Sequence, residues 1–324
     1  MRETIVAAMQ QCPAERGKRV NRRQFIKGST VGVLAASARG RIFADTPDEA
    51  KRARIAVSSY CFYNYFLSTR DRDAPPMEGK PFDLLDFPEM VADRYHVHNL
   101  EIVKGHFASR EPSYLQEVNA RLKKAHSRIV NIPIDIGELW DEPGLSSADT
   151  KARERAISLY KPWFDVAEAV GARSVRCDPG KINTADLSPT IASYQALGAY
   201  AKSKNLYVII ENHFGVGSEH PEELIRILRA AGGQVGALPD FGNFPDQPTR
   251  ERGLKLLFPL ARTVCHARDT EGDGKGGLVH FDLGQCVRIS KEAGYKGIYS
   301  VEAEATGDVY ANVQHVYDEL MKHI

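Results

Sequence analysis

The chain has 324 residues, of which 43% are hydrophobic and 26% are charged, and its formal net charge is +1. This length can bury a large core, and one large α/β domain accounts for it as well as two small domains would. Residues 1–38 contain seven Lys or Arg and two Glu, so the remaining chain carries a charge of about −4, which argues against nucleic acid as a partner.

The stretch at residues 21–38, "NRRQFIKGSTVGVLAASA", is typical of a twin-arginine export signal. The paired Arg22 and Arg23 precede a weakly apolar run that ends in small residues and is too short to span a bilayer. A disordered basic tail is the alternative interpretation. We expect residues 1–44 to be a signal peptide with a short linker, the protein to be exported to the periplasm, and no segment to span the membrane.

Four cysteines follow this signal: Cys61, Cys177, Cys265 and Cys286. Their even number is compatible with two disulfides in an oxidising compartment. Three of them nevertheless lie in predicted buried strands far apart in the sequence, where a free thiol behaves as a small apolar side chain. We therefore predict that no disulfide forms.

From residue 54 onward, short β-rich runs alternate with longer segments of helical periodicity. The predicted strands are residues 54–62, 99–105, 128–135, 173–178, 207–212, 235–240, 263–268 and 297–303. The predicted helices include residues 189–204, 221–231, 249–261 and 310–324. Gly171, Gly232 and Gly294 stand near helix ends, where a left-handed residue is favoured.

Eight strand–helix units predict a (β/α)₈ TIM barrel that forms a single domain over residues 45–324. A doubly wound open sheet is the alternative, but the chain has no Gly-rich dinucleotide fingerprint to support it. In a TIM barrel, the catalytic residues lie at the carboxyl ends of the strands. The polar residues at these ends are therefore the candidates for a functional site.

Four consecutive predicted strands end in metal-ligand side chains: Glu211, Asp240, His266 and Glu302. Each residue alone could be a polar strand end or a turn residue. The three carboxylates, crowded at the same rim, would repel one another unless a cation bound them. Three carboxylates and one imidazole suit Mn²⁺ or Mg²⁺, with Co²⁺ or Zn²⁺ as alternatives. We predict that these four residues bind one divalent cation, Mn²⁺ first among these.

Side-chain alternation predicts which neighbours share the inner face of the barrel. If His266 points inward, Val264 and Arg268 do so as well, and Cys265 points outward to the helices. The same rule places His213 on the face of Glu211. Each strand can thus offer a ligand and, two residues further on, a second polar group that faces the pocket.

The motifs "VIIENHFG", "LPDFGNF", "VCHARD" and "GYKGIYSVEAE", within residues 207–304, resemble the sugar phosphate isomerase/epimerase family of xylose isomerase-like TIM barrels. The resemblance implies that Glu211, Asp240, His266 and Glu302 bind one divalent metal, often Mn²⁺. It also implies that Glu211 and Glu302 are the paired acid and base of an epimerase. Many members have Lys where this chain has Arg268, which keeps the charge but presents a planar fork.

The resemblance favours a metal-dependent isomerase or epimerase that acts on a carbohydrate through an enediolate. We expect an unphosphorylated sugar or keto-sugar, because export separates the protein from sugar phosphates and no P-loop is present. His213, Arg268 and Lys104 are the candidate substrate-binding residues. A lyase of the same barrel, such as an inosose dehydratase or 3-keto-glycoside lyase, and an exported sugar-binding protein are the alternatives. The sequence leaves open whether the chain forms a homo-oligomer.

Two further segments have open interpretations. The aromatic residues after the first strand, Tyr60, Phe62, Tyr63 and Tyr65, either stack on a sugar or pack in the core. The segment "EGDGKGG", residues 271–277, is expected to be a mobile loop after the seventh strand.

Overall fold

The computed structural model describes residues 46–70, 80–139, 142–213, 215–272 and 277–324. The predicted signal peptide, residues 1–44, lies outside these ranges, so its export function stays a prediction. Within the described ranges, no helix has the length and apolarity that crossing a membrane requires.

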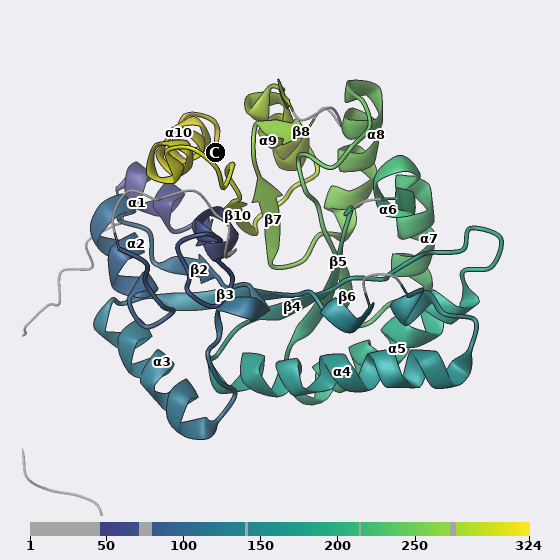
Figure 1. Ribbon diagram of the computed structural model, residues 1–324. Coiled ribbons are helices and arrows are strands. Elements are labelled where there is room, and N and C mark those ends of the chain that lie inside the picture. The colour runs from purple at the N-terminus through teal and green to yellow at the C-terminus, as the bar shows by residue number, and fades with distance from the viewer. Residues whose placement is uncertain (1–45, 71–79, 140–141, 214, 273–276) are drawn as a thin grey trace, which may run out of the picture. The chain divides into compact units, whose positions relative to one another are not determined.

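Eight parallel strands form one sheet, and the prediction of a TIM barrel is confirmed (Figure 1). The strands are β1 (Ile55–Ser58), β2 (Asn99–Glu101), β3 (Arg128–Ile134), β4 (Ser174–Cys177), β5 (Tyr207–Glu211), β6 (Val235–Leu238), β7 (Val264–Ala267) and β10 (Ile298–Val301). Their spatial order is β6-β5-β4-β3-β2-β1-β10-β7. Each predicted strand is present in its expected place, although all eight are shorter than the predicted runs.

The seam between β6 and β7 closes the barrel through isolated contacts instead of a continuous ladder. Parallel bridges join Ala237 to Ala261 and Asp240 to His266. The His266 N–H donates to the Pro239 carbonyl over 3.0 Å, and the Phe241 N–H donates to the His266 carbonyl over 3.1 Å. Two of the predicted metal ligands, Asp240 and His266, are therefore paired through the backbone that closes the barrel.

The helices cover the outside of the strands (Figure 1). They are α1 (Pro47–Arg52), α2 (Phe87–Tyr95), α3 (Pro112–Lys124), α4 (Thr150–Ala169), α5 (Ser188–Ser203), α6 (Gly215–Glu219), α7 (Pro221–Ala231), α8 (Gln247–Leu257), α9 (Leu283–Glu292) and α10 (Val309–His323). Gly171, Gly232 and Gly294 all have positive φ after helix ends, as predicted.

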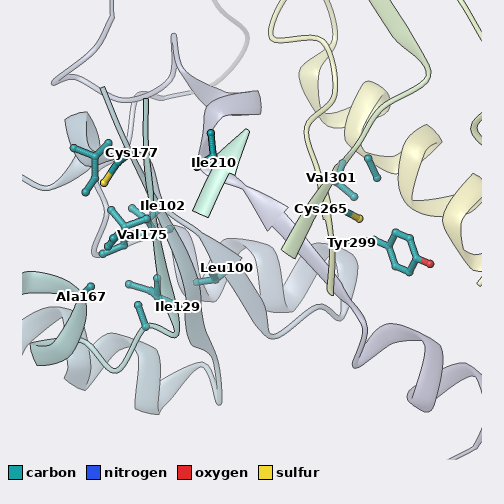
Figure 2. Packing of buried hydrophobic residues seen from close by; sticks show 14 of the residues in the cluster. Leu100, Ile102, Ile129, Ala167, Val175, Cys177, Ile210, Cys265, Tyr299 and Val301 are labelled. Carbon is teal, nitrogen blue, oxygen red and sulfur yellow. The ribbon is translucent and has the colours of Figure 1, made fainter. Parts of the chain in front are cut away.

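Side chains that point away from the barrel axis form the larger core, between strands and helices. Figure 2 shows Val175, Cys177, Ile210 and Cys265 among them. Burying one such aliphatic side chain contributes about 1.5–3 kcal/mol. The four cysteines of the described chain are buried free thiols, in agreement with the prediction.

A second, smaller apolar cluster fills the inside of the barrel. It consists of Ala56, Val130, Ile209, Leu238, Val264 and Ile298. Because Ile209, Leu238 and Val264 each precede a predicted metal ligand by two residues, the cluster forms an apolar floor beneath the ligands. The predicted alternation, with Val264 inside and Cys265 outside, is confirmed.

The segment after β7 differs from the prediction of a mobile loop. Thr270–Gly272 and Leu278–His280 pair as the antiparallel strands β8 and β9. Residues 273–276, between them, lie outside the described ranges. The adjacent apolar residues Leu278 and Val279 were the signal for this strand, but the glycines before them obscured it.

A buried histidine ties the segment after β1 to the segment after β2. His106 lies in the short 3₁₀ helix η2 (Lys104–His106), with Nδ1 2.8 Å from Ser59 Oγ and Nε2 3.0 Å from Thr69 Oγ1. The Val103 N–H donates to Ser59 Oγ, and the Thr69 hydroxyl donates to the Tyr63 carbonyl. Each donor in this series of hydrogen bonds has an acceptor when His106 is neutral and carries its proton on Nε2.

Burial lowers the pKa of His106 from 6.5 to about 3, and no charged group is bonded to it. As the pH falls below 6.5, the unfolded chain binds a proton at this residue while the folded chain does not, so folding stability is lost. Between pH 7 and pH 5, we expect the wild type to lose about 2 kcal/mol more unfolding free energy than His106→Gln, which lacks the buried histidine. Urea unfolding at both pH values measures this difference. Replacing the exposed His220 by Gln is the control, and an unchanged gap for His106→Gln would contradict the assignment.

Candidate functional site

The barrel brings the four predicted metal ligands together at the carboxyl ends of β5, β6, β7 and β10. Each of Glu211, Asp240, His266 and Glu302 offers one ligand atom, and these atoms all lie within 4.8 Å of one another. All four side chains are buried, with Glu302 the most exposed at 8%. Their convergence follows from parallel strands that end at one rim, as the sequence predicted.

The donor set fits a hard divalent cation. His266 Nδ1 lies 3.0 Å from Glu211 Oε1, 3.2 Å from Glu302 Oε2 and 3.5 Å from Asp240 Oδ2, so it faces the three carboxylates. Three carboxylates and one imidazole supply oxygen-rich ligation of the kind that Mn²⁺ and Mg²⁺ accept. The residues present therefore suit one such ion.

Two arginines, Arg176 buried and Arg268 half-buried, offset the negative charge of the ligands. Arg176 Nε, at the end of β4, lies 2.8 Å from Glu211 Oε2, and Arg268 Nη2 contacts both Asp240 Oδ2 and Glu302 Oε2. The predicted inward position of Arg268 is confirmed, whereas Arg176 was not among the predicted site residues. The sequence carried a signal for Arg176, a charged residue inside the apolar strand "RSVRCD".

These charges set the protonation of the carboxylates. Burial by itself raises the pKa of Glu211, but Arg176 and His266 outweigh it and hold that pKa well below its usual range. Burial also opposes ionisation of Glu302, and His266 and Arg268 again lower its pKa on balance. Both carboxylates are therefore ionised at neutral pH and able to accept a proton. For Asp240, burial prevails and the pKa is raised.

Asn212 explains why the strand that ends in Glu211 continues with an amide. Its side chain accepts from the Asp240 N–H over 2.7 Å and donates to the carbonyls of Asp240 and Gly242. The fully buried amide thus extends the β5–β6 pairing and holds the backbone of Asp240. At Gly242 a Cβ would lie 2.8 Å from Cδ of Arg268, so glycine leaves the space that this arginine occupies.

Cys61 holds the backbone around Glu302 in a similar way. Its Sγ accepts from the Ala303 N–H over 3.2 Å and donates to the Val301 carbonyl over 3.4 Å. Burial raises the pKa of this thiol, which keeps it protonated and able to donate. The cysteine therefore positions Glu302 and is not a nucleophile.

Glu101 and Asn243 are site residues that sequence analysis missed. Asn243, with positive φ, donates to Asp240 Oδ2 over 3.0 Å and to Glu211 Oε1 over 3.4 Å. Glu101, fully buried at the end of β2, has Oε1 2.9 Å from His266 Nε2, although the angle departs from an in-line hydrogen bond. A carboxylate in the apolar strand "NLEIV" was the available signal for Glu101.

Glu101 orients the imidazole. Asn131 donates to its Oε2 over 2.9 Å and Ser300 donates to its Oε1 over 3.2 Å, so the carboxylate is held on both oxygens. A proton on His266 Nε2 then faces Glu101, and Nδ1 is left with its lone pair toward Glu211, Asp240 and Glu302. Carboxylates in this position fix the tautomer and raise the basicity of a ligating histidine.

Above the ligands lies a cavity of about 670 Å³. Its lining includes all three predicted substrate-binding residues, Lys104, His213 and Arg268, together with Glu211 and Glu302. The Lys104 ammonium donates to the Asp135 carbonyl over 3.2 Å. His213 Nδ1 lies 3.3 Å from Asp178 Oδ2; burial lowers its pKa, but Glu211 and Asp178 raise it on balance. The three side chains thus lie around one cavity with the metal-ligand cluster.

Glu101→Gln should weaken Mn²⁺ binding by 10- to 100-fold, because the imidazole loses the carboxylate that fixes its proton on Nε2. Isothermal titration calorimetry on metal-free protein measures this directly. Glu117→Gln, on the exposed side of α3, is the matched control and should bind as the wild type does. Equal affinity in Glu101→Gln and the control would remove the assigned role.

The comparisons with known proteins agree with this architecture. No curated protein sequence matches the chain significantly. A Mycobacterium smegmatis xylose isomerase-like TIM barrel protein in complex with magnesium has a TM-score of 0.60 at 16% identity, covering 85% of this chain and 98% of its own. D-psicose 3-epimerase with D-tagatose from Clostridium cellulolyticum has a TM-score of 0.57 at 14% identity, covering 83% and 95%.

A third similar structure is described as a probable 3-DHS dehydratase from Bacillus anthracis, with a TM-score of 0.58 at 12% identity, covering 82% of this chain and 98% of its own. Identities this low show a shared fold and no more. The family model for the xylose isomerase-like TIM barrel matches residues 95–324, well over half of the chain. The chain therefore belongs to the xylose isomerase-like TIM barrel family.

Proposed function

We propose that the protein is a metal-dependent isomerase or epimerase that acts on an unphosphorylated sugar or keto-sugar. The observation that carries the proposal is the buried cluster of Glu211, Asp240, His266 and Glu302 beneath a substrate-sized cavity. These four residues would hold one divalent cation, Mn²⁺ by preference and Mg²⁺, Co²⁺ or Zn²⁺ as alternatives. The magnesium complex of the Mycobacterium smegmatis protein is in keeping with such a site.

A bound cation would supply Lewis acidity, which polarises a carbonyl and makes the neighbouring C–H more acidic. Glu211 and Glu302 come from strands on different sides of the cluster and are both ionised, so each can accept a proton. In the proposed reaction, one carboxylate removes the proton next to the carbonyl and gives an enediolate. The other returns a proton, on the opposite face for epimerisation or on the neighbouring carbon for isomerisation.

The remaining cavity residues orient the sugar. Arg268 presents a planar fork of donors beside Glu302, and Lys104 and His213 supply further donors around the cavity. The apolar floor formed by Ile209, Leu238 and Val264 closes the cluster from below. Water is thereby kept from the inner side of the carboxylates, which strengthens their interactions with charge.

A lyase is the second candidate, because the same enediolate can lose a β-substituent instead of regaining a proton. The similar fold of the Bacillus anthracis protein, described as a dehydratase, favours keeping it. The two reactions differ in their products: an isomer for the first, and an unsaturated product with released water or alcohol for the second.

Replacing Glu211 or Glu302 by Gln should lower turnover by 10²- to 10⁴-fold, because amides cannot accept the proton. The measurement is incorporation of solvent deuterium next to the carbonyl, with a panel of ketoses and 3-keto-glycosides in D₂O. Glu117→Gln is again the control. A protein that only binds sugars would incorporate no deuterium at all and would keep most of its ligand affinity in both variants.

Removing divalent metal with a chelator should abolish deuterium incorporation, and Mn²⁺ should restore it. The metal-free protein should also unfold at a lower temperature, because a ligand that binds the folded state alone stabilises it. With free Mn²⁺ at one hundred times its Kd, the gain is about 2.7 kcal/mol. Full activity in chelator-treated, metal-analysed protein would exclude the proposed role of the cation.

A further inference from the structure

Two exposed aromatic side chains lie at the candidate active site. Tyr60 and Tyr63 are 44% and 38% exposed, and among the described residues only Leu67, Leu278 and Val279 are other large hydrophobic side chains with comparable or greater exposure. Both tyrosines line the cavity that contains Glu302 and Arg268. Their ring centroids are 6.0 Å apart at an interplanar angle of 57°. Together they form an aromatic wall that nothing in the proposed reaction yet uses.

The aromatic wall of Tyr60 and Tyr63 is held in place by buried contacts. Ser59, directly before Tyr60, bonds to the Val103 N–H and to His106. The Tyr63 carbonyl accepts from the Thr69 hydroxyl over 2.7 Å. The neighbouring aromatic residues Phe62 and Tyr65 are buried in the core, so the same segment is anchored on its inner side. The wall is thus preorganised, which lowers the entropy cost of binding a ligand on it.

The wall extends outward from the metal ligands. Tyr60 lines the cavity together with Glu302 and Glu304. Tyr63 continues the surface toward His106, whose ring centroid is 5.9 Å away. A ligand that contacts Glu302, Tyr60 and Tyr63 is therefore longer than the part that the metal ligands would hold.

The cavity has room for more than one sugar ring. At ~30 Å³ for each water molecule, 670 Å³ corresponds to about 22 waters. A hexose has twelve non-hydrogen atoms, and a disaccharide has twenty-three. Bonded sugar atoms pack more closely than separate water molecules, so this volume is well above that of one ring and leaves room for a second.

We propose that Tyr60 and Tyr63 form a stacking subsite for a second sugar ring, so that the substrate is a glycoside or disaccharide and not a free monosaccharide. The proposal rests on the proposed function for the first ring, which the metal ligands would hold. Aromatic rings offer a rigid apolar face with which the C–H face of a pyranose packs. Glu304 and Asn64, which also line the cavity, are placed to accept and donate hydrogen bonds at the hydroxyl edge of that ring.

The test compares D-fructose with maltulose and isomaltulose, in which a glucosyl group is attached to fructose at O4 or O6. Affinity for the Mn²⁺-loaded protein is measured by calorimetry. We expect a disaccharide to bind wild type about tenfold more tightly than fructose, and Tyr63→Ala to lose this advantage while its affinity for fructose is unchanged. Tyr63→Phe keeps the ring and should keep the advantage.

Leu67→Ala is the matched control, because Leu67 is 68% exposed in the same segment and does not line the cavity. Equal affinity for fructose and both disaccharides, absence of binding by all three, or an equal loss in Tyr63→Ala for all three overturns the subsite. Deuterium incorporation by the wild-type protein is scored separately. Its absence with every sugar counts against the proposed reaction, whereas the affinity difference alone judges the subsite.

Discussion

The crowding of buried like charges at one rim of the barrel constrains the rest of the structure. Ligand atoms of three carboxylates and an imidazole lie within 4.8 Å of one another, and all four side chains are buried. Unpaired charges in such a place are strongly destabilising, so they need cations nearby. Arg176 and Arg268 provide two, and a divalent ion would provide a third. The crowded carboxylates thus destabilise the folded protein locally and give the site a strong preference for positive charge.

Several buried contacts around the cluster hold its four side chains in one geometry. The Asn212 side chain extends the pairing of β5 with β6 and holds the backbone of Asp240. A parallel bridge at the barrel seam then joins Asp240 to His266. Glu101 holds the imidazole from behind. Buried polar groups of this kind are favourable only when each has its partners, and here most of them do. The ligands therefore sit on backbone that is itself paired, and small displacements are resisted.

The active-site cavity combines two kinds of recognition. Its inner end is charged and would select a group able to chelate a cation, whereas its outer end presents the aromatic rings of Tyr60 and Tyr63. His106 supports the outer end, because the segments after β1 and β2 meet on it. A buried neutral histidine suits this role, since it can donate and accept at once without adding a buried charge.

Sequence periodicity alone determined the eight strands, the main helices and the alternation that turns Val264 inward and Cys265 outward. The convergence of Glu211, Asp240, His266 and Glu302 followed as well, because parallel strands in a barrel end at one rim. These features depend on residues near each other in the chain and on one rule of topology.

Contacts between distant segments were decided only by the tertiary structure. No local pattern shows that Glu101 lies behind His266, 165 positions later, or that Arg268 bridges Asp240 and Glu302. Nor does it separate the buried Phe62 and Tyr65 from the exposed Tyr60 and Tyr63, because the strand predicted for residues 54–62 gives way to the 3₁₀ helix η1 (Ser59–Phe62), where residues three apart share a face. The sequence by itself determined which side chains reach the rim; folding decided which of them touch, since pairing depends on the three-dimensional arrangement of strands and not on spacing along the chain.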